Sequence, residues 1–216
     1  KFNTNLVDIL NKNNMKNNKM FIFFSGLGVD VKSLSKRIRI IANTEEYLKR
    51  NFNNLSIIRP GIIIGGGDLF LKRLLPIFRF SFFIPLFGDG KAKLQPVFID
   101  DVARAIEIIV AKNFLNKNVF ELVGPEIFTY KSLYIHLKKC LRLTRVFVPI
   151  PFYIIRFLVS ILEKMSINLL TTDQLYLFKS DNFEQNIDKS FKDLDFSPQD
   201  IREIIKIYLN KISYFS

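Results

Sequence analysis

The sequence of 216 residues contains one cysteine, Cys140, one histidine, His136, and no tryptophan. A single cysteine cannot form an internal disulfide or a cysteine-based zinc site, so a reducing compartment suits the chain and we expect no metal. His136 stands in the helical pattern YKSLYIHLKKC, with Lys138 and Lys139 close behind it. We interpret it as an ordinary helix-face residue, because no convincing histidine-based catalytic triad can be assembled around it.

The sequence also lacks an apolar run of the roughly 20 residues that a membrane-spanning helix needs. The strongest candidate, 146–162, contains Pro149, Pro151 and Arg156. We expect a buried helix here, from Phe152 onward. A helix that lies on lipid stays open as the alternative, because aromatic residues with flanking cations are typical of that class.

Acidic residues are in deficit, with 20 Asp and Glu against 32 Lys and Arg and a net charge of +12. Such an excess can indicate nucleic acid, an acidic partner or an anionic membrane surface. We favour a compositional cause, since Lys, Asn, Ile and Phe are abundant together, as AT-rich codons would produce, and lysines occur in nearly every segment. An anionic membrane or acidic partner remains the alternative, and we do not expect nucleic acid.

What the chain does contain is apolar residues, which make up 49% of it and include 23 phenylalanines. That content is sufficient to bury a sizeable core. Apolar strand-length runs at 19–25 and 54–60 flank a helical pattern at 33–51, and further strand and helix patterns follow at 94–112 and 118–141. Strands separated by helices predict a parallel sheet covered by helices. A helical pattern at 3–14 opens the chain, and another at 199–212 closes it.

Three consecutive glycines, at 65–67, raise the question of a phosphate-binding loop. A dinucleotide cradle needs G-x-G-x-x-G, and Phe70 stands where the third glycine should be. We therefore interpret the triplet as a bend that leads into a helix over 69–80. Asp68 is predicted to cap this helix, and Pro76 to kink or shorten it.

Asp100 and Asp101 form an acidic pair at the start of a predicted helix. Neighbouring residues there point in different directions, so we interpret them as capping residues or partners of nearby backbone rather than as a catalytic pair.

Four segments resemble, in order and spacing, the atypical extended short-chain dehydrogenase/reductases. They look most similar to the nucleotide-binding accessory subunit of respiratory complex I and its bacterial relatives. The segments are FIFFSGLGVD (21–30), SIIRPGIIIGGGDLF (56–70), LQPVFIDDVARAIEIIV (94–110) and VFELVGPEIFTYKSL (119–133).

The resemblance implies an α/β fold, the C-terminal part of a Rossmann-type doubly wound parallel sheet with a smaller, mostly helical C-terminal domain. It assigns 1–123 to the remainder of the dinucleotide-binding domain, with 65–94 contributing to the second domain, and 124–216 to that second domain. Because the sequence opens inside a helical pattern with Lys1 rather than Met, we expect the N-terminal βαβ units to precede it.

The resemblance also implies a cofactor site for NADP or NAD. In the family a serine after the equivalent of strand 21–24 lies near the nicotinamide, which corresponds to Ser25 with Gly26. The backbone after the Arg-Pro strand passes the same ring, which corresponds to Pro60, Gly61 and Ile62. A glycine after a strand-ending proline is also common in plain turns, so both interpretations of Gly61 stay open.

The sequence departs from the family at the catalytic pair. Active members carry Tyr-x-x-x-Lys on the helix after the serine loop, and an ungapped count puts Arg37 and Ile41 at those positions. Arginine cannot deliver a proton near neutral pH, and isoleucine carries no charge. The literal Tyr134 to Lys138 pattern lies on a later helix, and we interpret it as coincidence. We therefore expect no catalytic residues.

The resemblance and this departure predict a non-catalytic subunit of a membrane respiratory complex, NADH:ubiquinone oxidoreductase, which holds its dinucleotide as a structural ligand. It would lie on the cytoplasmic or matrix side, peripheral to the inner membrane, with Phe152, Ile155 and Phe157 facing lipid or neighbouring subunits. The alternative is an NAD(P)-dependent epimerase, dehydratase or reductase acting on a nucleotide-sugar or another small carbonyl or hydroxyl substrate.

Overall fold

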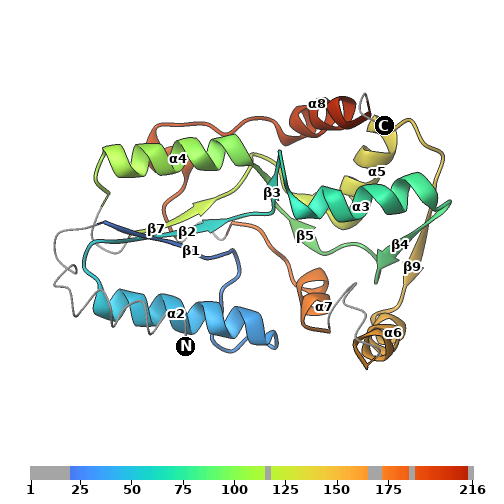
Figure 1. The fold of residues 1–216 in the computed structure, drawn as a ribbon, viewed down its shortest axis with the longest axis horizontal. Coiled ribbons are helices and arrows are strands. Elements are labelled where there is room, and N and C mark those ends of the chain that lie inside the picture. The colour runs from blue at the N-terminus through green and yellow to red at the C-terminus, as the bar shows by residue number, and fades with distance from the viewer. Residues whose placement is uncertain (1–19, 115–117, 165–171, 185–187, 214–216) are drawn as a thin grey trace.

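A parallel sheet between two helices forms one half of the molecule. The computed structural model describes residues 20–114, 118–164, 172–184 and 188–213, so the helix predicted at 3–14 lies outside the described residues. Strands β1 (Phe21–Phe24), β2 (Leu55–Pro60) and β7 (Asn118–Leu122) pair in the order β1-β2-β7, all parallel. Helix α2 (Lys36–Asn51) covers one face and α4 (Ile99–Ala111) covers the other (Figure 1). The predicted α/β class with a parallel sheet is confirmed.

Alternation along β2 explains why both of its faces are covered. Leu55 and Ile57 pack with Leu48 and Phe52 on the α2 side, whereas Ile58 packs on the α4 side. All five side chains are buried. A parallel strand buried on both faces is expected to read as a nearly continuous apolar run, which is how 55–58 reads.

The second half of the molecule has short strands and several helices around a separate core. Its elements are β3 (Ile63–Ile64), α3 (Leu69–Phe80), β4 (Phe83–Phe87), β5 (Lys93–Leu94), β6 (Val97–Phe98), β8 (Phe128–Thr129), α5 (Tyr130–Cys140), β9 (Val146–Ile150), α6 (Phe152–Lys164), α7 (Thr172–Lys179) and α8 (Ile201–Ser213). Strand β4 pairs with β9 in parallel, β3 with β6 in parallel, and β5 with β8 in antiparallel orientation. The core joins α3, α5 and α8 through residues that include Phe78, Tyr134 and Ile205.

The tail returns to the sheet before it reaches α8. A single turn of 3-10 helix, η1 (Phe191–Leu194), buries Phe191 and Leu194 against the α4 side, and Lys189 bridges to Phe120 of β7. The domain boundary at 123/124 stays a prediction, and the segment around η1 packs with the core of the sheet.

The glycine triplet forms the bend into α3. Asp68 accepts a hydrogen bond from the Leu71 N–H at 2.7 Å, so the predicted cap is confirmed. A Cβ on Gly65 would lie 2.3 Å from Cγ2 of Ile99, and Gly65 has a φ of +149°, so the close approach of α4 accounts for this glycine.

Of the two effects predicted for Pro76, shortening is excluded, because α3 continues to Phe80, and the kink stays a prediction. Burial of Leu75 and Phe78 around the proline holds the last turn, and the Arg145 guanidinium donates to the Phe78 and Arg79 carbonyls. These contacts offset the one backbone hydrogen bond that a proline removes.

Of the two structural roles predicted for the acidic pair, capping or a hydrogen bond to backbone, Asp101 does not act as a cap. Helix α4 has no side-chain cap at its N-terminus. The buried Asp101 carboxylate instead accepts from the backbone N–H of Gln199 at 2.8 Å and from its side-chain amide at 3.0 Å. Its role is structural, as expected, but it ties α4 to the segment before α8, 98 residues away.

None of the helices in the described ranges combines the length and hydropathy that a bilayer crossing requires.

Candidate functional site

The candidate site lies where the three parallel strands end. In open parallel sheets, ligands bind beyond the carboxyl ends of the strands. Ser25 directly follows β1 and donates its backbone N–H to Ile58 O at 2.8 Å, and Gly61 directly follows β2 and donates to Leu122 O at 2.9 Å. The sheet pairing therefore brings both predicted cofactor segments, 25–26 and 60–62, to the same edge.

Ser25 is tied to a buried carboxylate on α2. Its hydroxyl donates to Oε1 of Glu45 at 2.5 Å, and the Glu45 side chain is only 3% exposed. Arg59 of β2 forms a bidentate ion pair with the same carboxylate: its Nε donates to Oε1 at 3.0 Å and its Nη2 donates to Oε2 at 2.7 Å. Because the hydroxyl proton is committed to Glu45, Ser25 can offer a ligand only its oxygen lone pairs.

Arg59 extends this network across the sheet. Its Nη1 donates to Oδ2 of Asp188 at 2.8 Å and lies 3.7 Å from Oε1 of Glu121, its register partner on β7. The hydrogen bond to Glu45 is the main cause that raises the pKa of Arg59. Burial, followed by the charge of Glu121, raises the pKa of the Glu184 carboxyl. The result is a half-buried ionic cluster just below the strand ends.

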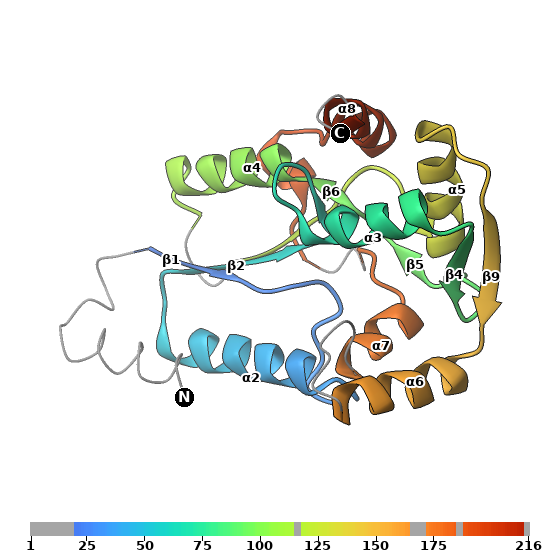
Figure 2. The same ribbon diagram turned by 45° about the vertical axis from the view of Figure 1, so that its right-hand side comes forward.

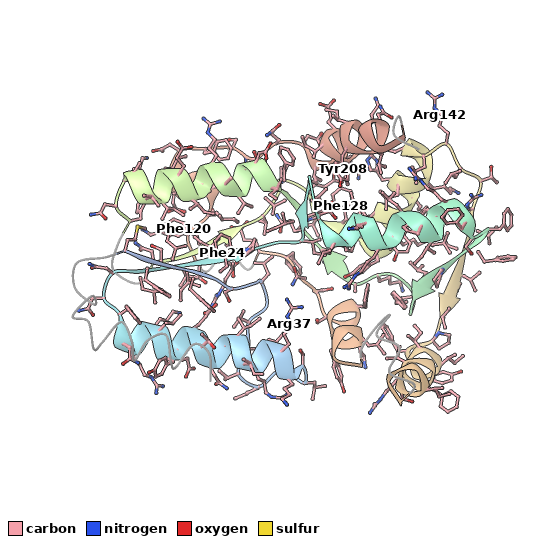
Figure 3. The ribbon with its side chains drawn as sticks, in the orientation of Figure 1. Phe24, Arg37, Phe120, Phe128, Arg142 and Tyr208 are labelled. Carbon is pink, nitrogen blue, oxygen red and sulfur yellow. The ribbon has the colours of Figure 1, made fainter. Side chains whose placement is uncertain are left out.

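Arg37 and Ile41 extend the helix face that carries Glu45. Residues four apart share one face of an α-helix, so 37, 41 and 45 form a single row on α2. Figure 3 shows the Arg37 side chain reaching from the start of α2 toward the sheet layer. Arg37 is exposed, and Ile41 is half-buried. The row that faces Ser25 therefore offers no group that can donate a proton near neutral pH and no cation at position 41.

Gly61 is explained by a backbone crossing. A Cβ at Gly61 would lie 2.0 Å from the Gln95 carbonyl oxygen, and one at Gly124 would lie 2.2 Å from the Pro96 carbonyl oxygen. The Gln95-Pro96 backbone thus passes against the ends of β2 and β7. This approach accounts for both glycines without a ligand. By contrast, a Cβ at Gly26 would meet nothing within 4 Å, so open space adjoins the loop after β1.

Gln95 joins the two halves of the molecule. Its side-chain amide donates to Gly124 O at 2.7 Å and accepts from the Glu184 N–H at 3.0 Å. Its backbone N–H donates to Asn182 O at 3.0 Å, and the Asn182 side chain reaches Leu27 O in the loop after β1 at 3.4 Å. The loop next to Ser25 is therefore fixed by the segment that follows α7.

A cavity of about 350 Å³ lies in the second half of the molecule, outside the candidate cofactor segments. It is lined by Phe87, Asp89, Lys91, Ala92, Phe152, Phe178, Lys179 and Asp181. Asp89 and Lys91 pair with each other at 3.2 Å, and Asp181 accepts from the Lys93 N–H at 2.9 Å.

The other candidate residues have structural roles. Tyr134 is 2% exposed and packs edge-on against Phe78, in agreement with a coincidental Tyr-x-x-x-Lys pattern. His136 contacts Arg202 O at 3.2 Å on α8. Among the described residues, no group of three or more His, Cys, Asp or Glu side chains is arranged to hold a metal ion.

Sequence reasoning missed Glu45 and Arg59, which organise the site. The sequence does contain a signal for this pair, because each of the two residues is a charge next to apolar residues. Arg59 follows the apolar run 55–58 of the strand, and Glu45 follows Ile41 by one turn of the helix. Either charge would be costly if buried alone, so the pair could have been proposed from the two patterns together.

The comparisons with known proteins agree with this geometry. No family model matches the chain. It is 28% identical over 192 residues to NADH dehydrogenase [ubiquinone] 1 alpha subcomplex subunit 9, mitochondrial, of Arabidopsis thaliana, an alignment that covers 84% of this chain and 48% of the relative. It is 26% identical over 194 residues to the NADH-ubiquinone oxidoreductase 40 kDa subunit of Neurospora crassa, covering 88% and 50%. The resemblance predicted from the four motifs is confirmed.

The chain thus spans about half the length of these complex I relatives. Solved structures agree on the fold. A nucleoside-diphosphate-sugar epimerase from Staphylococcus aureus superposes with a TM-score of 0.72 at 14% identity, covering 94% of this chain and 69% of that one. A human epimerase family protein with NADPH gives a TM-score of 0.68 at 15% identity, covering 95% and 71%. The complex I relatives and the epimerases therefore point to one Rossmann-type fold.

Proposed function

We propose that the protein is a non-catalytic accessory subunit of a membrane-bound NADH:ubiquinone oxidoreductase, and that it holds NADP or NAD as a structural ligand. The names of the matched relatives support the assembly, and the fold shared with NADPH-bound neighbours supports the ligand. The proposed location is the cytoplasmic or matrix side, peripheral to the inner membrane, next to an anionic lipid surface.

The observation that carries the non-catalytic assignment is the row on α2. Nicotinamide enzymes of this superfamily need a phenol that transfers a proton and a cation one turn away, and Arg37 and Ile41 supply neither. In addition, the Ser25 hydroxyl donates its hydrogen bond to Glu45, whose carboxylate is already paired with Arg59. Ser25 is therefore unable to donate to a substrate oxygen in this arrangement.

The residues at the strand ends fit a dinucleotide that is held but not turned over. A bound nicotinamide supplies hydride chemistry in enzymes and carries a carboxamide that donates hydrogen bonds. Ser25, with only lone pairs to offer, suits such a donor. The open space beside Gly26 leaves room at this edge of the sheet, where β2 also ends at Pro60 and is followed by Gly61 and Ile62. In this proposal Ser25 and the backbone of Pro60, Gly61 and Ile62 orient the nicotinamide ring.

Dinucleotide binding by the complete protein tests the ligand half of the proposal. Gly26→Val places a side chain into the open space and is expected to weaken binding of NADPH or NADH more than about tenfold. Gly66→Val is the matched control, because its Cβ would also meet nothing within 4 Å, on a loop away from Ser25. Equilibrium dialysis measures both. Absence of binding in the unaltered protein, or equal effects of the two variants, contradicts the assigned site.

An assay of turnover separates this proposal from the enzyme alternative. We expect the complete protein to bind dinucleotide without oxidising or reducing it in the presence of nucleotide-sugars or small carbonyl compounds. Turnover that Ser25→Ala abolishes would favour an epimerase, dehydratase or reductase. Co-migration with the intact oxidoreductase on a native gel tests the assembly half. A protein that is absent from the complex would overturn it.

A further inference from the structure

Two long segments of the chain contain no acidic residue. Residues 69–88 and 127–162 hold nine lysines and arginines and not one aspartate or glutamate, so they carry nine of the chain's excess of twelve positive charges. The cations are Lys72, Arg73, Arg79, Lys131, Lys138, Lys139, Arg142, Arg145 and Arg156. Basic residues occur throughout the chain, and outside these two segments acidic residues offset most of them.

The fold brings these two segments to one end of the molecule. They form α3, β4, α5, β9 and α6, and β4 pairs in parallel with β9, which leads directly into α6. In both views the end of α3, the β4–β9 ribbon and α6 lie at the side opposite to the outer end of the β1-β2-β7 sheet (Figures 1 and 2). The segments that lack acidic residues therefore lie together at this end of the molecule.

This surface is apolar on its outer side. Strand alternation buries Ile84 and Leu86 of β4 on the inner face, and the outer face of such a sheet would ordinarily be polar. Instead it exposes apolar side chains, and the chain on either side of β4 adds Phe80, 89% exposed, and Phe82. We call the following set the basic apolar face: Ile77, Phe80, Phe82, Phe83, Val146, Val148, Tyr153, Ile154, Phe157 and Ile161, with Arg79, Arg142, Arg145 and Arg156.

Helix α6 continues the face with a different set of residues from the one predicted. Ile155 is buried and packs with Val159 and Leu175, and Phe152 touches Gly88 and lines the cavity, so the expectation that both face lipid is wrong. Phe157 is 65% exposed, as expected. Tyr153, Ile154 and Ile161 expose apolar surface beside it, although α6 already buries its inner face.

Cations accompany these apolar residues at the same end of the molecule. Arg145 is fixed at the start of β9 by its hydrogen bonds to the Phe78 and Arg79 carbonyls. Lys138 lies 5.4 Å from the centre of the Phe147 ring. Arg142, at the end of α5, projects away from the fold (Figure 3), and Arg156 is exposed on α6 between Tyr153 and Phe157 in the sequence.

We infer that the basic apolar face docks on the surface of an anionic lipid bilayer, with aromatic and aliphatic side chains at the acyl boundary and arginines at the headgroups. Charge complementarity selects this occupant. A second copy of the chain would bring the same uncompensated cations into contact, and like charges oppose association. The inference rests on the proposed function for its membrane setting, and it specifies the surface.

Vesicle flotation of the complete protein tests the inference. Phosphatidylcholine vesicles with about one third phosphatidylglycerol are expected to bind it, and pure phosphatidylcholine vesicles to bind it far less. Phe82→Ser and Phe157→Ser should each weaken binding about tenfold. Arg142→Ser should weaken it about fivefold, and salt near 0.5 M should release the protein.

Matched controls lie on the sheet half of the molecule. Val110→Ser removes an apolar side chain of similar exposure from α4, and Lys32→Ser removes an exposed cation from the loop after β1. Neither should alter vesicle binding. The inference would be overturned if neutral vesicles bound the protein equally well, or if the face and control variants had equal effects. Self-association of the protein through the basic apolar face would overturn it as well. Dinucleotide binding by the same variants is expected to be unchanged, so failure here is distinguishable from failure of the proposed cofactor site.

Discussion

Arg59 holds three carboxylates from three separate segments, Glu45, Glu121 and Asp188, at a position that is only 17% exposed. Removal of its charge would leave Glu45 buried without its main cation. We therefore expect Arg59→Met to lower the free energy of unfolding by about 3–5 kcal/mol, measured by urea denaturation.

Ser25→Ala provides the comparison within the same cluster. It removes one hydrogen bond to Glu45 and leaves the Arg59 pair in place, so its expected cost is about 1.5–3 kcal/mol. If Arg59→Met cost no more than Ser25→Ala, the ionic cluster would not be a major contribution to stability. Because Ser25 also borders the candidate cofactor site, this small cost allows its effect on ligand binding to be measured in folded protein.

Gly61 and Gly66 differ in what surrounds them. A Cβ at Gly61 would lie 2.0 Å from a backbone oxygen, which cannot move aside as a flexible side chain can, whereas one at Gly66 would meet nothing within 4 Å. Gly61→Ala is expected to destabilise the protein by at least about 2 kcal/mol, within the range of core overpacking, and Gly66→Ala by less than about 0.5 kcal/mol. Thermal unfolding of the two variants measures the difference. Similar midpoints would show that the Gln95 crossing is not tight.

At the scale of single elements, local patterns were sufficient to predict most of the helices and strands. Alternation and apolar runs predicted β1, β2 and β7, and Asp68 marked the start of α3. Two predictions held only in part because distant contacts decided them: Arg145 binds the last turn of α3, which is not shortened at Pro76, and Gln199 takes the carboxylate of Asp101, which does not cap α4. Such partners are far apart in sequence, so no local window contains both.

His136 connects α5 to α8 and makes that contact sensitive to pH. Burial, and secondarily the Arg202 charge, lower its pKa from the ordinary 6.5, while the Arg202 carbonyl, Glu126 and Asp200 oppose this. A lowered folded-state pKa favours the neutral ring, so its contribution to stability is present above about pH 6.5 and is lost as pH falls through the folded-state pKa.

We therefore expect the His136→Gln variant to lose less stability than the unaltered protein between about pH 7 and pH 5. Urea unfolding at several pH values measures this slope. The Lys139→Gln variant is a suitable control, since it changes an exposed charge on the same helix without a titrating group in that range. An identical slope in the unaltered protein and His136→Gln would assign the pH dependence to other groups.

At the scale of the whole molecule, the sequence predicted the fold and the edge of the sheet that carries the candidate site. It did not reveal the ionic cluster or the basic apolar face. Both depend on pairing between segments far apart in the chain: Glu45 with Arg59 across the α2–sheet interface, and β4 with β9 across 63 residues by the register of Phe83 with Val146. Composition averages over such surfaces, so the net charge alone could not show that two segments at one end of the molecule lack acidic residues.

Gln95 is the clearest point at which the two halves of the molecule are joined, since its amide satisfies Gly124 O and the Glu184 N–H together. Gln95→Leu would keep the volume and leave both buried backbone groups unpaired, at an expected cost of about 2–4 kcal/mol in the free energy of unfolding.

Gln95→Glu separates hydrogen bonding from packing at this position. When the new glutamate side chain is ionised, one carboxylate oxygen still accepts from the Glu184 N–H. The other oxygen then faces the Gly124 carbonyl oxygen, and no proton lies between them. As a protonated acid, the side chain can donate to that carbonyl as the native amide does. Burial raises the pKa of an acid, so this variant is expected to regain stability relative to Gln95→Leu as pH falls toward about 5. Unfolding curves of the two variants that stay parallel over this range would indicate that the amide acts by filling space rather than by bridging the halves.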